Sequence, residues 1–138
     1  MKKSDILFEK EFNLDAIRDH RDLKVYQKAF QFASKIFDLS KSFPKEEKYS
    51  LTNQIRRSSR SVGSNIVEAF RSRMYPKSFT SKINISEAEA AETQHWLDIA
   101  LDCDLIDEEI YRAYRNEYDN IIGMLVNMKR SADKWGFK

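Results

Sequence analysis

The residues of this chain best suited to chemistry are basic side chains gathered in and just after the segment NQIRRSSRSVGSNIVEAFRSR, residues 53–73. The planar guanidinium of arginine matches two phosphate oxygens at once, and several along one ridge give salt-dependent affinity for nucleic acid. Tyr75 lies nearby in the sequence as an aromatic ring on which a base could stack. The sequence therefore predicts a candidate nucleic-acid-binding surface made of six residues: Arg56, Arg57, Arg60, Arg71, Arg73 and Lys77.

The distribution of charge leaves two interpretations of these residues open. Net charge is only +2, yet residues 45–82 contain nine Lys/Arg against three acids, and residues 83–119 contain two arginines against eleven acids. Either the basic segment meets an anionic partner such as RNA or DNA, or it pairs with acids on the next helix. The acids available for such pairing are Glu87, Glu89 and Glu92.

Other chemistries find little support in the sequence. The single Cys103 excludes an intramolecular disulfide, and His20 and His95 are too few for a zinc cluster with familiar ligand spacings. Glu92 and Asp98 flank His95 three residues away on either side, but a carboxylate-bridged metal centre in a helical bundle needs paired Glu-x-x-His motifs. No glycine-rich phosphate loop is present. We therefore expect no enzyme activity, no metal, no cofactor and no small-molecule substrate.

Composition indicates one all-α domain. The chain has 138 residues, 41% hydrophobic and 33% charged, with only 3 Gly and 2 Pro, which favours long helices over a many-turned β fold. No apolar run approaches the roughly 20 residues needed to cross a membrane, and the first residues lack the apolar stretch of a secretory signal. On these grounds we expect a cytoplasmic protein without a membrane partner.

Apolar residues at alternating spacings of three and four predict an antiparallel, up-down four-helix bundle with short loops. Pro44 and Pro76 mark helix boundaries, Asp22 and Asp107 are candidate N-caps, and Gly136 is placed to end the last helix. We expect an N-terminal arm over residues 1–20, partly ordered or docked on a neighbour, and a bundle domain over residues 21–136. The expected helices are about 22–42, 45–73, 76–103 and 107–135.

The second predicted helix carries a third face beside its apolar and arginine-rich faces. Its small and amide side chains recur at spacings of three and four, typical of a contact surface that keeps polar groups satisfied. Plain solvent exposure is one explanation, and a subunit interface or a groove within the bundle is the other. Gly63, in mid-helix, predicts a kink or a close approach. The residues of this third face are Gln54, Ser58, Ser61, Asn65 and Glu68.

The stretch FPKEEKYSLTNQIRRSSRSVGSNIVEAFRSR resembles the four-helix bundle protein family, also called the 23S rRNA intervening-sequence proteins. The upstream LKVYQKAFQFASKIFDLSKSFPKEE is similar to the first helix of that family, and the resemblance covers about residues 22–130. The family pattern is a leucine, a Q-I-R-R run, and then S-V-P-x-N-I-A-E-G followed by a basic residue. Its matching positions here are Leu51, Gln54, Ile55, Arg56, Arg57, Ser61, Val62, Asn65, Ile66, Glu68 and Arg71.

The resemblance implies a ring-like homo-oligomer, often a pentamer, with no known catalysis and with RNA binding suspected. A related group, similar in fold and basic surface, serves as accessory proteins of diversity-generating retroelements. The chain departs from the pattern at Gly63, Val67 and Ala69, where the family usually has Pro, Ala and Gly, and in SEAEAAET, where it usually has a G-S-x-x-E-like stretch. The resemblance favours a nucleic-acid-binding oligomer, and a structural or protein-interaction module with no nucleic-acid ligand is the alternative.

Overall fold

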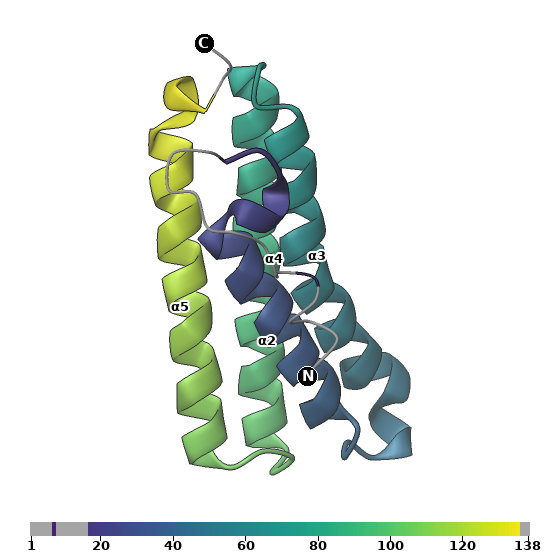
Figure 1. Ribbon diagram of the computed structural model, residues 1–138. Helices are drawn as coiled ribbons and strands as arrows, with labels where there is room; N and C mark the ends of the chain where they lie inside the picture. The colour runs from purple at the N-terminus through teal and green to yellow at the C-terminus, as the bar shows by residue number, and fades with distance from the viewer. Residues whose placement is uncertain (1–6, 8–16, 136–138) are drawn as a thin grey trace.

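The computed structural model describes Leu7 and residues 17–135. Within them the chain runs up and down through four long antiparallel helices, which confirms the predicted all-α four-helix bundle (Figure 1). The predicted N-terminal arm falls almost wholly outside the described residues, as does Gly136. The helices are α2 (Lys24–Ser40), α3 (Asn53–Arg71), α4 (Pro76–Asp102) and α5 (Glu108–Arg130).

The helix boundaries follow the predicted ones with two differences. The segment predicted as one helix from residue 45 begins with a 3-10 turn, η2 (Lys45–Glu47), and a π turn, η3 (Lys48–Thr52), before α3 starts. At the other end of the chain, α5 stops at Arg130 rather than near residue 135. A short 3-10 turn, η4 (Ala132–Lys134), follows it.

The two predicted N-caps have different outcomes. Asp107 caps α5, because its Oδ1 accepts a hydrogen bond from the Ile110 backbone N–H at 2.8 Å. The expectation that Asp22 caps the first long helix is wrong. Its carboxylate instead accepts the backbone N–H groups of Arg18 and Asp19, which closes a capping box around the 3-10 turn η1 (His20–Asp22). The N-cap residue of α2 is Leu23, so α2 begins at Lys24 without a side-chain cap.

The end of α4 turns sharply through Asp104, which has a positive φ of 60°. The Leu105 N–H reaches the Ala100 carbonyl at 2.9 Å and the Asp104 N–H reaches the Leu101 carbonyl at 3.0 Å, which is the Schellman pattern of helix ends. Cys103 is the last residue before this turn and is exposed, as expected for a residue near a helix end.

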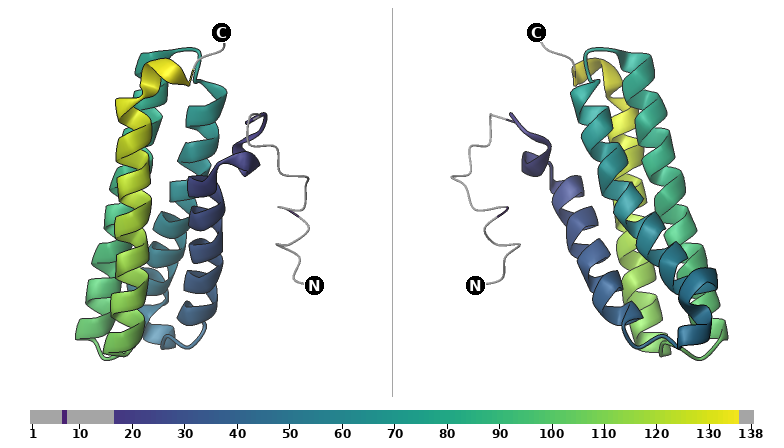
Figure 2. Two further views of the ribbon diagram at one scale, coloured as in Figure 1. Left: turned by 60° about the vertical axis from the view of Figure 1, so that its left-hand side comes forward. Right: turned by 90° about the vertical axis from the view of Figure 1, so that its right-hand side faces the viewer.

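The core is organised around α3, which packs against α2 and α4, while α4 also packs against α5 (Figure 2). α3 and α4 lie close together because small residues line their contact: the buried Ser86 hydroxyl donates to the Val62 carbonyl across it at 2.8 Å. Small residues in the middle of α4, Ser86 and Ala90 among them, are thus buried in this contact. The largest fully buried side chains are Tyr118, Phe70, Phe79, Ile36, Leu51, Ile55, Ile66, Ile83, Leu97, Ile121, Leu125 and Val62.

Antiparallel order fixes which segments share an end of the bundle. The α3–α4 connection and the C-terminal end of α5 lie together at one end, uppermost in Figure 1. The α2–α3 and α4–α5 connections lie together at the opposite end (Figures 1 and 2). Segments 71–78 and 130–135 are therefore neighbours although more than fifty residues separate them in the sequence.

Gly63 is not required by a close approach, which is one of the two roles predicted for it from sequence. α3 continues unbroken through it, and a Cβ added there would lie 3.7 Å from the Tyr26 ring, an ordinary contact. Gly123, in the middle of α5, has nothing within 4 Å of such a Cβ. Both glycines therefore reduce helix stability without relieving a steric conflict.

Gly63→Ala and Gly123→Ala should each raise the free energy of unfolding by about 0.5–1 kcal/mol, because alanine restricts the unfolded chain and fits both helices. Urea unfolding monitored by circular dichroism measures the change. Gly123→Ala reports helix propensity alone, so a lower stability for Gly63→Ala alone would show that the Tyr26 ring cannot accommodate the added methyl.

Tyr118 of α5 is fully buried, and its ring meets Phe32 of α2 edge-on at a centroid distance of 6.1 Å. Among the described residues its hydroxyl has no hydrogen-bond partner. Burial, and to a lesser degree Tyr114, raise the pKa of Tyr118 well above its usual value. A buried hydroxyl without a partner costs about 1–3 kcal/mol of stability.

Tyr118→Phe should therefore be at least as stable as the wild type, with a gain of up to about 1–3 kcal/mol. The matched control is Tyr111→Phe, which removes a hydroxyl that donates to Asp98 at 2.7 Å and should lower stability. Thermal and urea unfolding of the two variants give the comparison. A clear loss on Tyr118→Phe would mean that its hydroxyl has a partner in solution, such as a buried water.

Candidate nucleic-acid interface

Arg57 is engaged by acids of the neighbouring helix. Its guanidinium forms an ion pair with Glu89 at 3.0 Å and a second with Glu92. Glu92 also accepts a hydrogen bond from the indole N–H of Trp96 at 3.2 Å, so its carboxylate is itself held in place on α4. Arg57 thus follows the interpretation in which the basic segment meets the acids of the next helix, and its charge is largely compensated within the chain.

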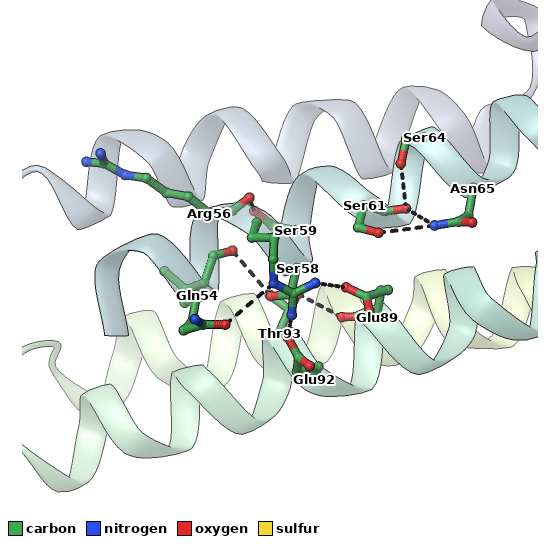
Figure 3. A network of polar contacts seen from close by, with 12 residues as sticks. Gln54, Arg56, Ser58, Ser59, Ser61, Ser64, Asn65, Glu89, Glu92 and Thr93 are labelled. Atoms are coloured by element: carbon green, nitrogen blue, oxygen red, sulfur yellow. Dashed lines mark hydrogen bonds and ion pairs between the residues drawn. The ribbon is translucent and has the colours of Figure 1, made fainter. Parts of the chain in front are cut away.

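Arg56 and Arg60 lie on the other flank of α3, against α2. The Arg56 Nε donates to the Ser40 hydroxyl at 2.7 Å, and its guanidinium lies 4.6 Å from the centroid of the Phe37 ring. Arg60 approaches the same ring at 5.3 Å and is exposed. Figure 3 shows the Arg56 side chain directed away from Glu89 and Glu92. The three arginines in the first half of α3 therefore lie on two different flanks of the helix and do not form one continuous ridge.

The third face of α3 lies partly against α4. Ser58 is buried, and its hydroxyl is 2.8 Å from that of Thr93 on α4 (Figure 3). The Asn65 amide donates to the Ser61 carbonyl at 2.9 Å and to the Ser61 hydroxyl at 3.1 Å, so it is satisfied inside its own helix. The face is thus partly buried against α4 rather than simply exposed to solvent.

The two outer members of this face lie at its margins. Gln54 Oε1 is 3.5 Å from Arg57 Nε, and it helps to hold the arginine that reaches the acids of α4. The exposed Glu68 forms an ion pair with Lys82 of α4 at 3.5 Å. The Glu68–Lys82 pair joins α3 to α4, whereas the Gln54–Arg57 contact lies within α3.

The three remaining predicted residues lie together at one end of the bundle. Arg71 is the last residue of α3, Arg73 is in the connection, and Lys77 is in the first turn of α4. The C-terminal end of α5 brings Arg130 and Lys134 to the same end. The Phe79 and Trp135 rings stack at 6.2 Å, which holds the chain after η4 against the start of α4. We call these five residues the basic end: Arg71, Arg73, Lys77, Arg130 and Lys134.

The two segments that carry the basic end contain few acids. Segments 71–78 and 130–135 contain these five cations and a single acid, Asp133. Burial, and next the charge of Arg71, lower the pKa of Arg73, so the two guanidinium groups repel one another. At the opposite end of the bundle, segments 41–48 and 102–109 contain seven acids and three lysines. Charge is therefore segregated along the bundle axis.

Helix dipoles explain only part of the basic end. α3 and α5 both finish there, and cations such as Arg71 and Arg130 are favourable near the partial negative charge of a helix C-terminus. Lys77 is different, because it lies at the N-terminus of α4, where the partial charge is positive and acids are preferred. The helix dipole therefore does not explain a cation at this position.

Neither a metal cluster nor a membrane-spanning helix is found in the part of the chain that the structure describes. No group of three or more His, Cys, Asp or Glu side chains in residues 17–135 could hold a metal ion. The His95 ring is exposed and lies 4.8 Å from the Trp96 ring. None of the four helices is long and apolar enough to cross a membrane.

The fold and this surface define an all-α four-helix bundle with a charged end. The chain belongs to the 23S rRNA-intervening sequence protein family, whose model matches residues 21–127. It is similar to a protein of unknown function from the S23 ribosomal protein family of Bacteroides thetaiotaomicron VPI-5482. The two are 32% identical, with a TM-score of 0.71, over 78% of this chain and 96% of that one. Comparison with curated proteins gives no match.

Lys77→Glu should raise the free energy of unfolding by about 0.3–1 kcal/mol at low ionic strength, since it replaces a cation with an acid at a helix N-terminus. Urea unfolding measures the gain, and Lys77→Gln should show a smaller gain of the same sign. Both gains should shrink in high salt because the interaction is screened. A loss of stability in Lys77→Glu would show that Lys77 contributes to the fold.

Proposed function

We propose that this protein is a non-enzymatic, homo-oligomeric cytoplasmic module that binds RNA through the basic end. The observation that carries the proposal is the accumulation of five cations against one acid in segments 71–78 and 130–135, including Lys77 where folding disfavours it. Several such cations on one surface release counterions from a polyanion, which gives affinity with little dependence on base sequence. Arg56, Arg57 and Arg60 lie in the first half of α3, toward the opposite end of the bundle, where Ser40 holds Arg56 and Glu89 and Glu92 compensate Arg57. These three arginines therefore stand apart from the basic end.

Self-association is the second part of the proposal, with a pentamer as the expected assembly. α4 supports it, because the exposed side chains on its outer surface include the uncharged Ile85, Ala88 and Ala91. In a ring with the subunits side by side, the basic ends of all copies would lie on one face. Weak phosphate contacts repeated around that face would add up to a high avidity.

RNA is preferred to DNA as the ligand because of the family to which the chain belongs. Its name ties the members to intervening sequences of 23S rRNA. The chemistry of the basic end favours phosphate in general, so the identity of the polyanion is a point for experiment.

The alternative is a structural or protein-interaction module with no nucleic-acid ligand. The contacts in the first half of α3 favour this alternative, because Arg57 pairs with acids of α4 and Arg56 is held by Ser40 and Phe37. In that case the arginines only stabilise contacts within the bundle, and packing alone explains the residues of the family motif. The two functions predict opposite results for charge reversal at the basic end.

Binding of a fluorescent structured RNA should be lost, by at least tenfold in affinity, in the variant Arg71→Glu/Lys77→Glu. The slope of log affinity against log salt should fall by roughly 1.5, because about two phosphate contacts are removed. The matched control is Lys45→Glu/Lys48→Glu, which makes the same change in charge at the opposite end. It should retain RNA affinity close to that of the wild type.

Light scattering coupled to size exclusion should give a mass several times 16.3 kDa for the wild type and both variants. A monomer at micromolar concentration contradicts the oligomer. Wild-type protein that binds no RNA at low salt, or an equal loss of affinity in both charge-reversal variants, contradicts the basic end as the ligand surface. The interaction-only function would then stand.

A further inference from the structure

Tyr75 is a large apolar side chain that the fold leaves in water. It is 71% exposed, although it connects two long, well-packed helices. The neighbouring Met74 is 47% exposed. Neither side chain belongs to the buried core, so packing does not explain an aromatic residue at this position.

The connection that carries Tyr75 is firmly hydrogen-bonded. The Arg73 N–H donates to the Phe70 carbonyl at 3.3 Å, and the Tyr75 N–H donates to the Ser72 carbonyl at 2.9 Å. The Tyr75 carbonyl then accepts the Phe79 N–H at 2.9 Å as the first turn of α4. The backbone of Tyr75 is therefore fixed on both sides, which limits the conformational entropy lost when its ring binds a partner.

The surroundings of Tyr75 are cationic. Arg73 and Lys77 lie two residues before and after it, and the Arg73 guanidinium is itself held, 3.9 Å from the Phe70 ring centroid and 2.8 Å from the Phe70 carbonyl oxygen. Segment 71–78 contains no acid. An exposed ring between phosphate-binding cations suits a nucleotide whose base lies open, because base and phosphate can be contacted together.

We propose that the basic end recognises single-stranded RNA, with the Tyr75 ring stacking on an unpaired base while the neighbouring cations contact the flanking phosphates. The inference rests on the proposed RNA-binding function and specifies its substrate class. In duplex RNA the bases are already stacked on one another and the major groove is deep and narrow, so the ring has no base face to contact. Phosphate contacts alone would bind either form.

The chain offers a matched control for this residue. Tyr49, in the π turn at the opposite end of the bundle, is 74% exposed and close to the Lys48 ammonium, 5.4 Å from its ring centroid. Its near neighbours include Glu46 and Glu47 instead of an acid-free cationic segment. Tyr49 and Tyr75 thus share exposure and side-chain type but differ in electrostatic surroundings.

The experiment compares two fluorescent probes, a twelve-nucleotide oligoadenylate and an RNA duplex with the same number of phosphates, by anisotropy at low salt. Tyr75→Ala should weaken oligoadenylate binding about tenfold, the loss typical of one base–aromatic stack, and leave duplex binding unchanged. Tyr75→Phe and Tyr49→Ala should bind both probes as the wild type does. The salt dependence of Tyr75→Ala should match that of the wild type because no phosphate contact is removed.

Three results would overturn the inference, and they separate it from the proposed function. Wild type that binds both RNAs, with Tyr75→Ala unchanged, retains the RNA-binding function and removes the stacking role. An equal loss of both probes in Tyr75→Ala also removes it, because single strands are then not distinguished. If the wild type binds neither probe, the RNA-binding function itself fails. Circular dichroism melts of each variant confirm that the bundle is folded.

Discussion

The structure depends on the close approach of α3 and α4. Small side chains make it possible, and their hydroxyls are satisfied across the contact: Ser86 donates to the Val62 carbonyl at 2.8 Å, and the Ser58 and Thr93 hydroxyls are 2.8 Å apart. With one side of α3 on the core and a second against α4, only a narrow third side stays in water. Arginines on that side lie at its edges, where Arg57 meets the acids of α4 and Arg56 meets Ser40 of α2. The contact between α3 and α4 therefore determines the packing of the bundle. The pairing of Arg57 with the acids of α4 also reduces the positive charge that the first half of α3 presents to solvent.

The charge that is not compensated by the seam collects where helices end. Antiparallel order brings the end of α3, the start of α4 and the end of α5 together, so cations from segments far apart in sequence become neighbours. The C-terminal ends of α3 and α5 favour cations through their helix dipoles, whereas the N-terminal end of α4 does not. Lys77 is thus a position where local stability and surface charge conflict, and such conflicts are typical of functional surfaces.

Sequence alone predicted the four helices and most of their boundaries, because apolar spacing, proline and Asp107 each act locally. Sequence also indicated two alternatives for the arginines, pairing with acids of the next helix or contact with an anionic partner. It could not decide between them, because the pairing of Arg57 with Glu89 depends on how the two helices are rotated about their axes. Arg130 and Lys134 were absent from the candidate surface, because their sequence position explains them as dipole partners of the last helix. The predicted up-down topology contained the missing information, because it places the end of the fourth helix at the same end of the bundle as the end of the second. The role of Asp22 could not be predicted, because its carboxylate can either cap the following helix or close the capping box of the 3-10 turn η1, and both are local interactions.

The segregated charges have a consequence for how the molecule moves toward a partner. In an antiparallel bundle the dipoles of successive helices oppose one another, so the side chains at the two ends determine the electric moment along the axis. Positive charge at one end and negative charge at the other give the molecule an electric dipole moment along its axis, and the field of a polyanion would exert a torque on that moment. Within a Debye length of about 8–10 Å of a polyanion, such a moment would turn the basic end toward it and the acidic end away from it. The orientation of the molecule would then be selected during diffusion, before any contact forms.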